Sequence, residues 1–251
     1  MDKPGNIALE ITEEIGILKI DNPPGNFILS PEFISLPILK NWIEENGIKG
    51  LLITGTGRHF SGGASLETLF DSASLRDEME SDLNKGMALL QFIQTLNIPV
   101  VAAIQGTCFG GGVEIALSCH IRIAATNALF AFPEVNHSLI PGLGGTFEIM
   151  QRTSMMKTIS LILGGDMISA EEALTMKVID QIVPKEKLFD HTFQLLKKIT
   201  AGRNIKVIHS VMQAVHNARR LTREKALKEE TRMFCELAFE EVKRRRMENR
   251  K

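Results

Sequence analysis

The sequence contains few residues of the kinds that bind structural metals. Its 251 residues include three cysteines, at positions 108, 119 and 235, and their spacing matches no metal-binding motif. The six histidines are scattered and form no H-x-x-x-H pair. An odd number of cysteines also suits a reducing compartment better than a disulfide framework. We therefore expect no metal site and a cytoplasmic location.

The sequence also lacks long apolar runs and a strong net charge. No stretch approaches 18 uninterrupted apolar residues, and no charged-then-apolar leader precedes a small-residue cleavage site. The 29 basic and 30 acidic residues nearly cancel, so no global charge would attract nucleic acid or an anionic membrane. Internal repeats and low-complexity linkers are not found. We expect an ample buried core and no nucleic-acid or membrane partner.

The most informative stretch lies in the middle of the chain. Residues 99–104 (PVVAAI) are apolar and rich in β-branched side chains, which predicts a buried strand, and a glycine run follows at residues 110–112. Residues 114–119 (EIALSC) then predict a short apolar helix. A strand, a glycine turn and a helix together direct backbone N–H groups at a negative charge. Glycine permits close approach, and the helix N-terminus supplies unpaired donors.

Two common uses of such a turn are missing from the sequence. A P-loop would require Gly-Lys-Ser/Thr and a nucleophile elbow would require Gly-x-Ser-x-Gly, and neither follows the strand. A tight strand–helix crossing without further role and an N–H pocket for a carbonyl-derived oxyanion both stay open. Glu134, in residues 130–135 (FAFPEV), is suited to acid–base chemistry, because apolar surroundings raise the pKa of a carboxylate.

The remaining pattern predicts strands in the first two thirds of the chain and helices mainly in the last third. Strands are expected at residues 15–21, 50–55, 99–104 and 120–125. Helices are expected at residues 33–46, 78–96, 114–119, 142–151, 156–163, 170–176, 185–199, 205–219 and 222–246. This mixture predicts the α/β class.

Ordered motifs give a specific resemblance to a known family. They are residues 51–64 (LLITGTGRHFSGGA), 99–106 (PVVAAIQG), 110–116 (GGGVEIA), 132–134 (FPE) and 141–146 (PGLGGT). Together they resemble the enoyl-CoA hydratase/isomerase family, the crotonase superfamily. The resemblance implies a crotonase-like spiral of β-β-α units in residues 1–195, which carries the active site. It also implies a helical C-terminal region in residues 196–251 for oligomerisation and substrate cover.

The resemblance further implies the site residues and their roles. The backbone N–H groups of Ala64 and Gly111 match the family's oxyanion hole for a thioester carbonyl. Glu114 and Glu134 match the two catalytic glutamates of hydratases. Substrate-binding positions implied in the same way are Gly63, Ser65, Leu66, Gly110 and Gly142.

The reaction implied by this resemblance adds water to a 2-enoyl thioester or removes it. Coenzyme A or phosphopantetheine then enters as part of the substrate, and no tightly bound cofactor is expected. An acyl carrier protein is a candidate partner, and the resemblance implies a homotrimer or homohexamer.

Three alternatives to a hydratase stay open at this stage. An isomerase that moves a double bond along the acyl chain needs one carboxylate, usually the one that matches Glu134. A carrier-protein-bound dehydratase or decarboxylase of polyketide-type biosynthesis shares the fold. A non-enzymatic scaffold or RNA-binding relative would be expected to have a broken site.

Three residues differ from what relatives commonly carry or lie close to the expected chemistry. Glu67 stands where relatives often have lysine, so we expect the carrier's phosphates to bind elsewhere, with the basic tail at residues 243–251 as a candidate. His120 stands where relatives commonly have aspartate and is interpreted as a structural residue. His137, three residues after Glu134, is the histidine nearest the expected chemistry.

Overall fold

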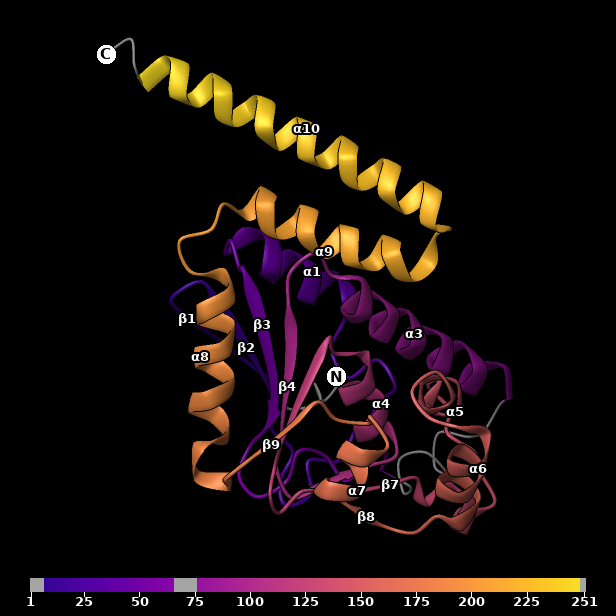
Figure 1. Ribbon diagram of the computed structural model, residues 1–251. Coiled ribbons are helices and arrows are strands. Elements are labelled where there is room, and N and C mark those ends of the chain that lie inside the picture. Colours follow the sequence, from indigo (N-terminus) through magenta and orange to yellow (C-terminus); the bar gives the residue numbers. More distant parts are fainter. Residues whose placement is uncertain (1–6, 66–75, 249–251) are drawn as a thin grey trace.

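A six-stranded sheet forms the centre of the molecule. The computed structural model describes residues 7–65 and 76–248, and Figure 1 shows the sheet flanked by helices. In spatial order the strands are β1 (Ile7–Thr12), β2 (Ile15–Ile20), β3 (Gly50–Gly55), β4 (Val100–Ile104), β6 (Ile121–Ala125) and β9 (Gln181–Val183). β1 runs antiparallel to β2, and the other neighbours are parallel.

Both faces of this sheet are covered, which explains why its central strands are apolar on both sides. One face packs against α1 (Leu36–Glu45), α3 (Arg76–Thr95) and α4 (Gly111–Ser118). The other face packs against α8 (Leu188–Thr200), which lies on the opposite side of the sheet in Figure 1. Parallel strands require long crossover connections, and the helices both supply these connections and bury the strands.

A second sheet of three short strands carries the segments around the glycine run. It consists of β5 (Thr107–Phe109), β7 (Leu129–Ala131) and β8 (Ile168–Ser169), in that order. β5 is parallel to β7, and Gly110 follows β5 directly. One residue separates β7 from the 3₁₀ turn η1 (Pro133–His137). Because the two strands are parallel neighbours, the glycine run and Glu134 emerge at the same edge.

The sequence predicted the longer elements and missed the shorter ones. The predicted strands are confirmed as β2, β3, β4 and β6. The predicted helices are confirmed as α1, α3, α4, α5 (Gly145–Met150), α6 (Met155–Gly164), α7 (Ala170–Thr175), α8, α9 (Ile205–Arg220) and α10 (Arg223–Glu248). The short strands β5, β7, β8 and β9 carry too few residues for a readable alternation, and β1 was also missed. The predicted α/β class is confirmed.

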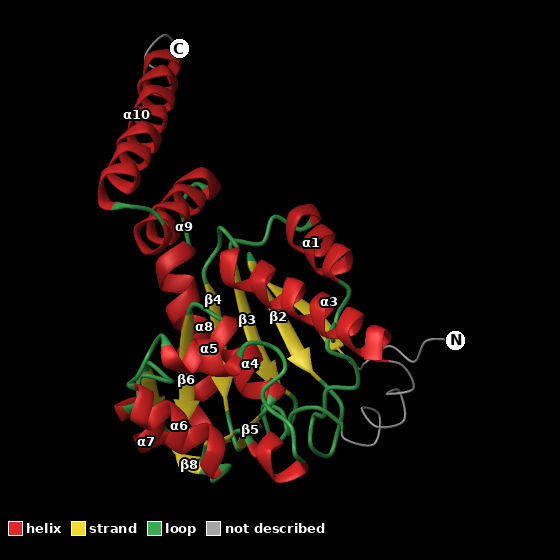
Figure 2. Cartoon of the chain, turned by 90° about the vertical axis from the view of Figure 1, so that its right-hand side faces the viewer, coloured by secondary structure: helices red, strands yellow, loops and turns green. Residues whose placement is uncertain are grey.

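The helices α9 and α10 lie outside the sheet layers. Figures 1 and 2 show α10 projecting beyond the body, with α9 next to it. The predicted boundary between residues 195 and 196 falls inside α8, which continues to Thr200 because Leu196 and Thr200 are buried with the rest of that helix. The helical region therefore begins after Thr200 rather than at residue 196. Among the described residues, no helix is long and apolar enough to cross a membrane.

Candidate active site

The glycine run forms a turn that leaves backbone donors at the start of α4. Gly110 has φ 47° and ψ −119°, a conformation that favours glycine. Its own N–H donates to Ala131 O at 2.9 Å, which ties the turn to the end of β7. Gly111 is the first residue of α4, so its N–H has no partner within the helix. The turn therefore presents the Gly111 N–H as an available donor.

A second available donor lies beside Gly111. The segment around Ala64 pairs with Ile28 as a parallel bridge, in which the Ile28 N–H donates to Gly63 O at 2.8 Å and the Ser65 N–H donates to Ile28 O at 2.9 Å. In this pattern Gly63 and Ser65 make the hydrogen bonds to Ile28, and the N–H of Ala64 points away from Ile28. A Cβ atom on Gly111 would lie 3.9 Å from the Ala64 nitrogen. The two N–H groups therefore lie next to one another.

Ser61 holds the two segments that carry these donors. Its side chain is fully buried, and its hydroxyl donates to Asn26 O at 2.8 Å and accepts from the Gly63 N–H at 3.1 Å. Its backbone carbonyl accepts from the Phe109 N–H at 3.0 Å, immediately before the glycine turn. One residue thus links the loop of Ala64, the turn at Asn26 and the end of β5. Ser61 was not among the predicted site residues, although it lies inside the motif at residues 51–64.

Glu114 is buried in the first turn of α4 with one carboxylate oxygen fully engaged. Its Oε1 accepts from the Leu143 N–H at 2.7 Å and from the Gly145 N–H at 2.8 Å, both at the start of α5. Burial raises the pKa of Glu114 to about 7, against the opposing effect of the two N–H donors. Oε2 makes no hydrogen bond within residues 7–65 and 76–248 and is the oxygen that remains for another molecule.

Glu134 lies across the glycine turn on η1, with a different set of neighbours. A Cβ atom on Gly110 would overlap Oε1 of Glu134, so only glycine leaves room for this carboxylate. Its Oε2 is buried and has no hydrogen-bond partner among the described residues. Burial raises the pKa of Glu134, and the nearby charge of Glu134 in turn raises the pKa of Glu114. Glu134 is therefore close enough to influence the ionisation of Glu114.

An open cavity of about 440 Å³ connects the Ala64 loop with Glu134. Its lining residues are Phe27, Gly62, Gly63, Ala64, Ser65, Gly110, Pro133, Glu134, His137 and Leu139. Of the predicted site residues, Gly63, Ala64, Ser65, Gly110 and Glu134 line this cavity, while Gly111 and Glu114 are not among its lining residues. Phe27 and His137 were not among the predicted site residues, since neither belongs to a motif.

The remaining predicted positions lie elsewhere. Gly142 is exposed, and a Cβ atom on it would lie 3.1 Å from the side chain of Leu83 on α3, outside the cavity lining. Leu66, predicted to bind substrate, and Glu67, predicted to disfavour phosphate, lie outside the described residues.

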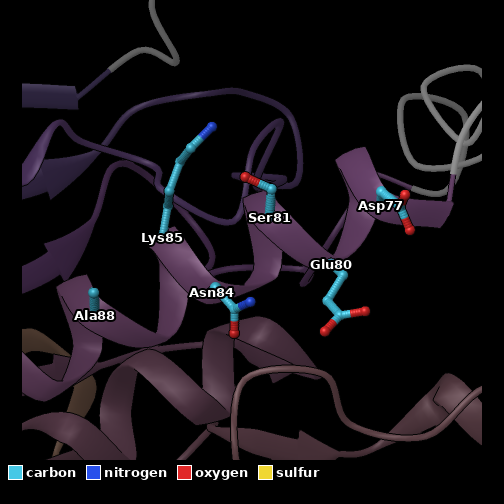
Figure 3. Close-up of a pocket in the computed structure, with 6 residues that line it drawn as sticks. All are labelled: Asp77, Glu80, Ser81, Asn84, Lys85 and Ala88. Atoms are coloured by element: carbon cyan, nitrogen blue, oxygen red, sulfur yellow. The ribbon is translucent and has the colours of Figure 1, made fainter.

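A larger hollow of about 630 Å³ lies along α3 and contains none of the predicted site residues. Figure 3 shows its lining side chains projecting from one helix. They are Asp77, Glu80, Ser81, Asn84, Lys85 and Ala88. Lys85 pairs with Asp82 on the same helix at 2.7 Å, as expected of a solvated surface. No group of three or more potential metal ligands occurs in the part of the chain that the structure describes.

His120 has the structural role that the sequence analysis favoured. Its Nδ1 accepts from the Val100 N–H at 2.9 Å, and its Nε2 lies 3.1 Å from Gln94 O. Both ring nitrogens are therefore used, and burial lowers the pKa of His120 to about 4. A neutral histidine joins the end of α3 to the start of β4.

Comparisons with known proteins agree with this arrangement. The chain matches the enoyl-CoA hydratase/isomerase family over residues 10–250. It is 32% identical over 237 residues to a probable enoyl-CoA hydratase of Bacillus subtilis, covering 93% of this chain and 90% of that protein. It is 33% identical to the fatty acid oxidation complex subunit alpha of Idiomarina loihiensis, covering 90% of this chain and 33% of that longer protein.

The fold is similar to that of solved structures. A structure from Geobacillus kaustophilus described as enoyl-CoA hydratase subunit I has a TM-score of 0.83 and 25% identity, and the alignment covers 96% of this chain and 93% of that one. This likeness confirms the predicted crotonase-type fold with its helical C-terminal region. With the match to nearly the whole sequence, it shows that the chain belongs to the enoyl-CoA hydratase/isomerase family.

Proposed function

We propose that this protein hydrates 2-enoyl thioesters, or catalyses the reverse reaction, with Glu114 and Glu134 as its acid–base pair. The observation that carries the proposal is the presence of two carboxylates with raised pKa values beside two available backbone donors. Raised pKa values keep carboxyl groups close to the point at which they exchange protons near neutral pH. The similarity to enoyl-CoA hydratases and to a fatty acid oxidation subunit supports acyl chains of the fatty-acid type.

The thioester carbonyl accepts hydrogen bonds from the N–H groups of Ala64 and Gly111. When water adds to C3, negative charge moves through C2 onto this oxygen, and the two donors bind it more strongly than the ground-state carbonyl. One donor of this kind contributes roughly 3 kcal/mol to lowering the barrier. The donors require no rearrangement, because Ser61 and the Ile28 bridge already hold their backbone.

The two carboxyl groups divide the proton transfers. A water molecule is held between Glu114 Oε2 and Glu134. Glu114, as the carboxylate, orients this water and accepts one of its protons while the hydroxide adds to C3. Glu134, as the carboxylic acid, gives its proton to C2. The proton on Glu114 then passes to Glu134, so the net reaction adds one water across the double bond and restores both groups.

Isomerisation of a 3-enoyl thioester is the second candidate, and one observation favours it. Glu134 lines the cavity, whereas Glu114 is not among the lining residues and already accepts two hydrogen bonds. A double-bond shift needs one group that removes a proton from C2 and returns it to C4. Glu134 alone would serve this reaction.

Absorbance measurements with two substrates separate these candidates. Purified protein with crotonyl-CoA should lower the absorbance of the conjugated enoyl thioester, because hydration removes the double bond. With 3-hexenoyl-CoA, an isomerase would instead raise this absorbance by moving the double bond into conjugation. Activity confined to 3-hexenoyl-CoA would overturn the hydratase proposal in favour of the isomerase.

The helical region after Thr200, together with α6, is proposed to mediate a homotrimer or a dimer of trimers. Large apolar side chains are exposed on α6 and α10, and burial in an assembly would stabilise them. They are Met155, Met156, Ile159, Leu163, Leu227, Phe234 and Phe239. Light scattering at micromolar concentration should give three or six times the chain mass of 27.8 kDa. A monomer mass would contradict this proposal.

A further inference from the structure

The cavity contains a titratable side chain that the proposed mechanism does not use. Among the described lining residues, Glu134 and His137 are the two with titratable side chains, apart from the hydroxyl of Ser65. The remaining described lining is backbone or apolar, including Phe27, Pro133 and Leu139. In the described part of this cavity lining, the imidazole of His137 supplies a side-chain hydrogen-bond donor in addition to the Ser65 hydroxyl.

The geometry of η1 directs Glu134 and His137 to the same side. Residues three apart in a 3₁₀ helix eclipse one another, separated by about 6 Å along the axis. The two residues between them, Val135 and Asn136, pack against Gly165 at the end of α6. A Cβ atom added to Gly165 would lie 2.8 Å from the Val135 side chain and 3.1 Å from the Asn136 side chain. The turn therefore divides its side chains between α6 and the cavity.

The position of His137 is fixed by the backbone that follows it. Ser138 has φ 59° and its N–H donates to Val135 O at 3.1 Å, while the Leu139 N–H donates to Glu134 O at 3.0 Å. These bonds close the turn on both sides of His137. The imidazole itself makes no hydrogen bond or ion pair within residues 7–65 and 76–248, so its donor is available to a bound molecule.

We propose that His137 selects acyl thioesters whose chain carries a hydrogen-bond acceptor, a hydroxyl or a carboxylate, beyond the reacting carbons. This inference rests on the proposed function for where the thioester lies. The carbonyl is held at Ala64 and Gly111, the C2–C3 bond lies at Glu134, and His137 is one turn of η1 further on. A spacing of about 6 Å matches the distance from the reacting carbons to a group at C5 or C6. The imidazole is exposed to solvent, so an apolar tip gains no hydrogen bond from it, whereas an acceptor on the chain does.

The test uses three saturated coenzyme A thioesters that differ only at the end of a five-carbon chain. Valeryl-CoA ends in a methyl group, 5-hydroxyvaleryl-CoA in a hydroxyl and glutaryl-CoA in a carboxylate. None of them can be hydrated, so calorimetric dissociation constants report recognition independently of catalysis. If the hydration assay failed, the proposed function would be wrong, but the dissociation constants could still be interpreted.

Three proteins are compared: the wild type, His137→Leu and His137→Gln. We expect His137→Leu to weaken the binding of glutaryl-CoA and 5-hydroxyvaleryl-CoA about tenfold, a loss of about 1.4 kcal/mol. The dissociation constant of valeryl-CoA should not change. His137→Gln keeps a neutral donor, so it should retain 5-hydroxyvaleryl-CoA. If it also retains glutaryl-CoA, a hydrogen bond suffices for both ligands, and if it loses glutaryl-CoA, the carboxylate requires the imidazolium charge.

His209→Leu is the matched control, because His209 is an exposed histidine on α9, outside the cavity lining. It should leave all three dissociation constants unchanged. Equal weakening of all three thioesters by His137→Leu would show that His137 contacts the shared carrier arm and would overturn the proposal. No change for any of them would overturn it as well.

Discussion

Glu114 and Glu134 are the same kind of residue in two different environments. Glu114 lies inside the α4–α5 junction, where two backbone N–H groups hold one of its oxygens. Glu134 lies on a short turn that faces an open cavity, and its buried Oε2 has no partner among the described residues. Burial raises the pKa of both carboxyl groups. The N–H donors that oppose this rise come from Leu143 and Gly145 for Glu114, and from its own backbone for Glu134.

This difference separates the roles of the two groups. A carboxylate fixed by two donors has one free oxygen with a defined direction, which suits it to orient water. Glu134 lines the cavity that would hold the acyl chain, which suits it to exchange a proton with carbon. Pairs of titratable groups in contrasting environments commonly divide acid and base roles in this way. The contrast also predicts which substitutions should affect one group and spare the other.

Substitution of Gly110 should have the largest effect on the Glu134 side. In Gly110→Ala the added methyl group would overlap Glu134 Oε1 at a residue with φ 47°. Displacement of the carboxyl group should lower kcat by at least about a hundredfold. Backbone strain should cost about 1–3 kcal/mol of stability. Steady-state kinetics with crotonyl-CoA and urea unfolding measure the two effects.

Gly47→Ala is the matched control for this prediction. Gly47 follows α1, outside the site, and also has a positive φ, 59°, but nothing lies within 4 Å of an added Cβ atom. It should therefore lose stability to strain and retain kcat to within a few-fold of the wild type. Equal kcat values for the two variants would show that contact between Gly110 and Glu134 has no functional role.

Removal of the Ser61 hydroxyl should have a smaller effect that spares both carboxylates. Ser61→Ala leaves the Gly63 N–H unpaired and loosens the loop that carries the Ala64 donor. We expect kcat to fall about tenfold with little change in KM. A small misplacement of the donors reduces their binding of the transition state more than their binding of the substrate. A chromophoric cinnamoyl thioester should also show a smaller red shift on binding, since the shift reports carbonyl polarisation.

Ser118→Ala provides the comparison for Ser61. The Ser118 hydroxyl is also buried, and it donates to Ile115 O at 2.7 Å within α4. Its loss should reduce stability without altering the red shift. A full red shift in Ser61→Ala would contradict the assignment of Ser61 as a positioning residue.

The pH dependence of stability should report the ionisation of Glu114. Its folded pKa of about 7 lies above the usual value of 4.5, so between these values the folded state holds a proton that the unfolded chain releases. Stability should therefore decrease as the pH rises from 5 to 8. Residue 114 cannot ionise in Glu114→Gln. The free energy of unfolding of this variant should therefore fall by up to about 3 kcal/mol less than that of the wild type over this range.

Urea unfolding followed by the fluorescence of Trp42, the single tryptophan, gives these stabilities at both pH values. Glu134→Gln serves as the comparison, because Glu114 keeps its buried position in that variant. Identical pH dependence in the wild type and Glu114→Gln would show that Glu114 is ionised throughout.

The sequence predicted the parts of this arrangement that depend on local pattern. The buried strand at 99–104, the glycine turn and the helix after it follow from composition and order. The resemblance then identified Ala64, Gly111, Glu114 and Glu134, which the structure brings together, while their roles stay proposals. The family motifs therefore located the candidate site more completely than the spacing of residues alone.

The remaining features depend on contacts between distant segments. The cavity position of His137 requires the 3₁₀ geometry of η1 and its packing on Gly165, neither of which has a sequence pattern. The role of Ser61 depends on Asn26, 35 residues earlier in the chain. Gly142 was expected to bind substrate because it lies in a motif, yet its backbone faces Leu83 on α3. Such residues are recognised only when the chain is folded.

If hydration uses both carboxyl groups, kcat for crotonyl-CoA should fall in Glu114→Gln and in Glu134→Gln. Glutamine keeps the shape of each side chain and removes its capacity for proton transfer. Each variant should stay folded and lose on the order of a hundredfold or more in kcat. A Glu114→Gln enzyme that hydrates crotonyl-CoA at the wild-type rate would contradict the two-carboxylate mechanism.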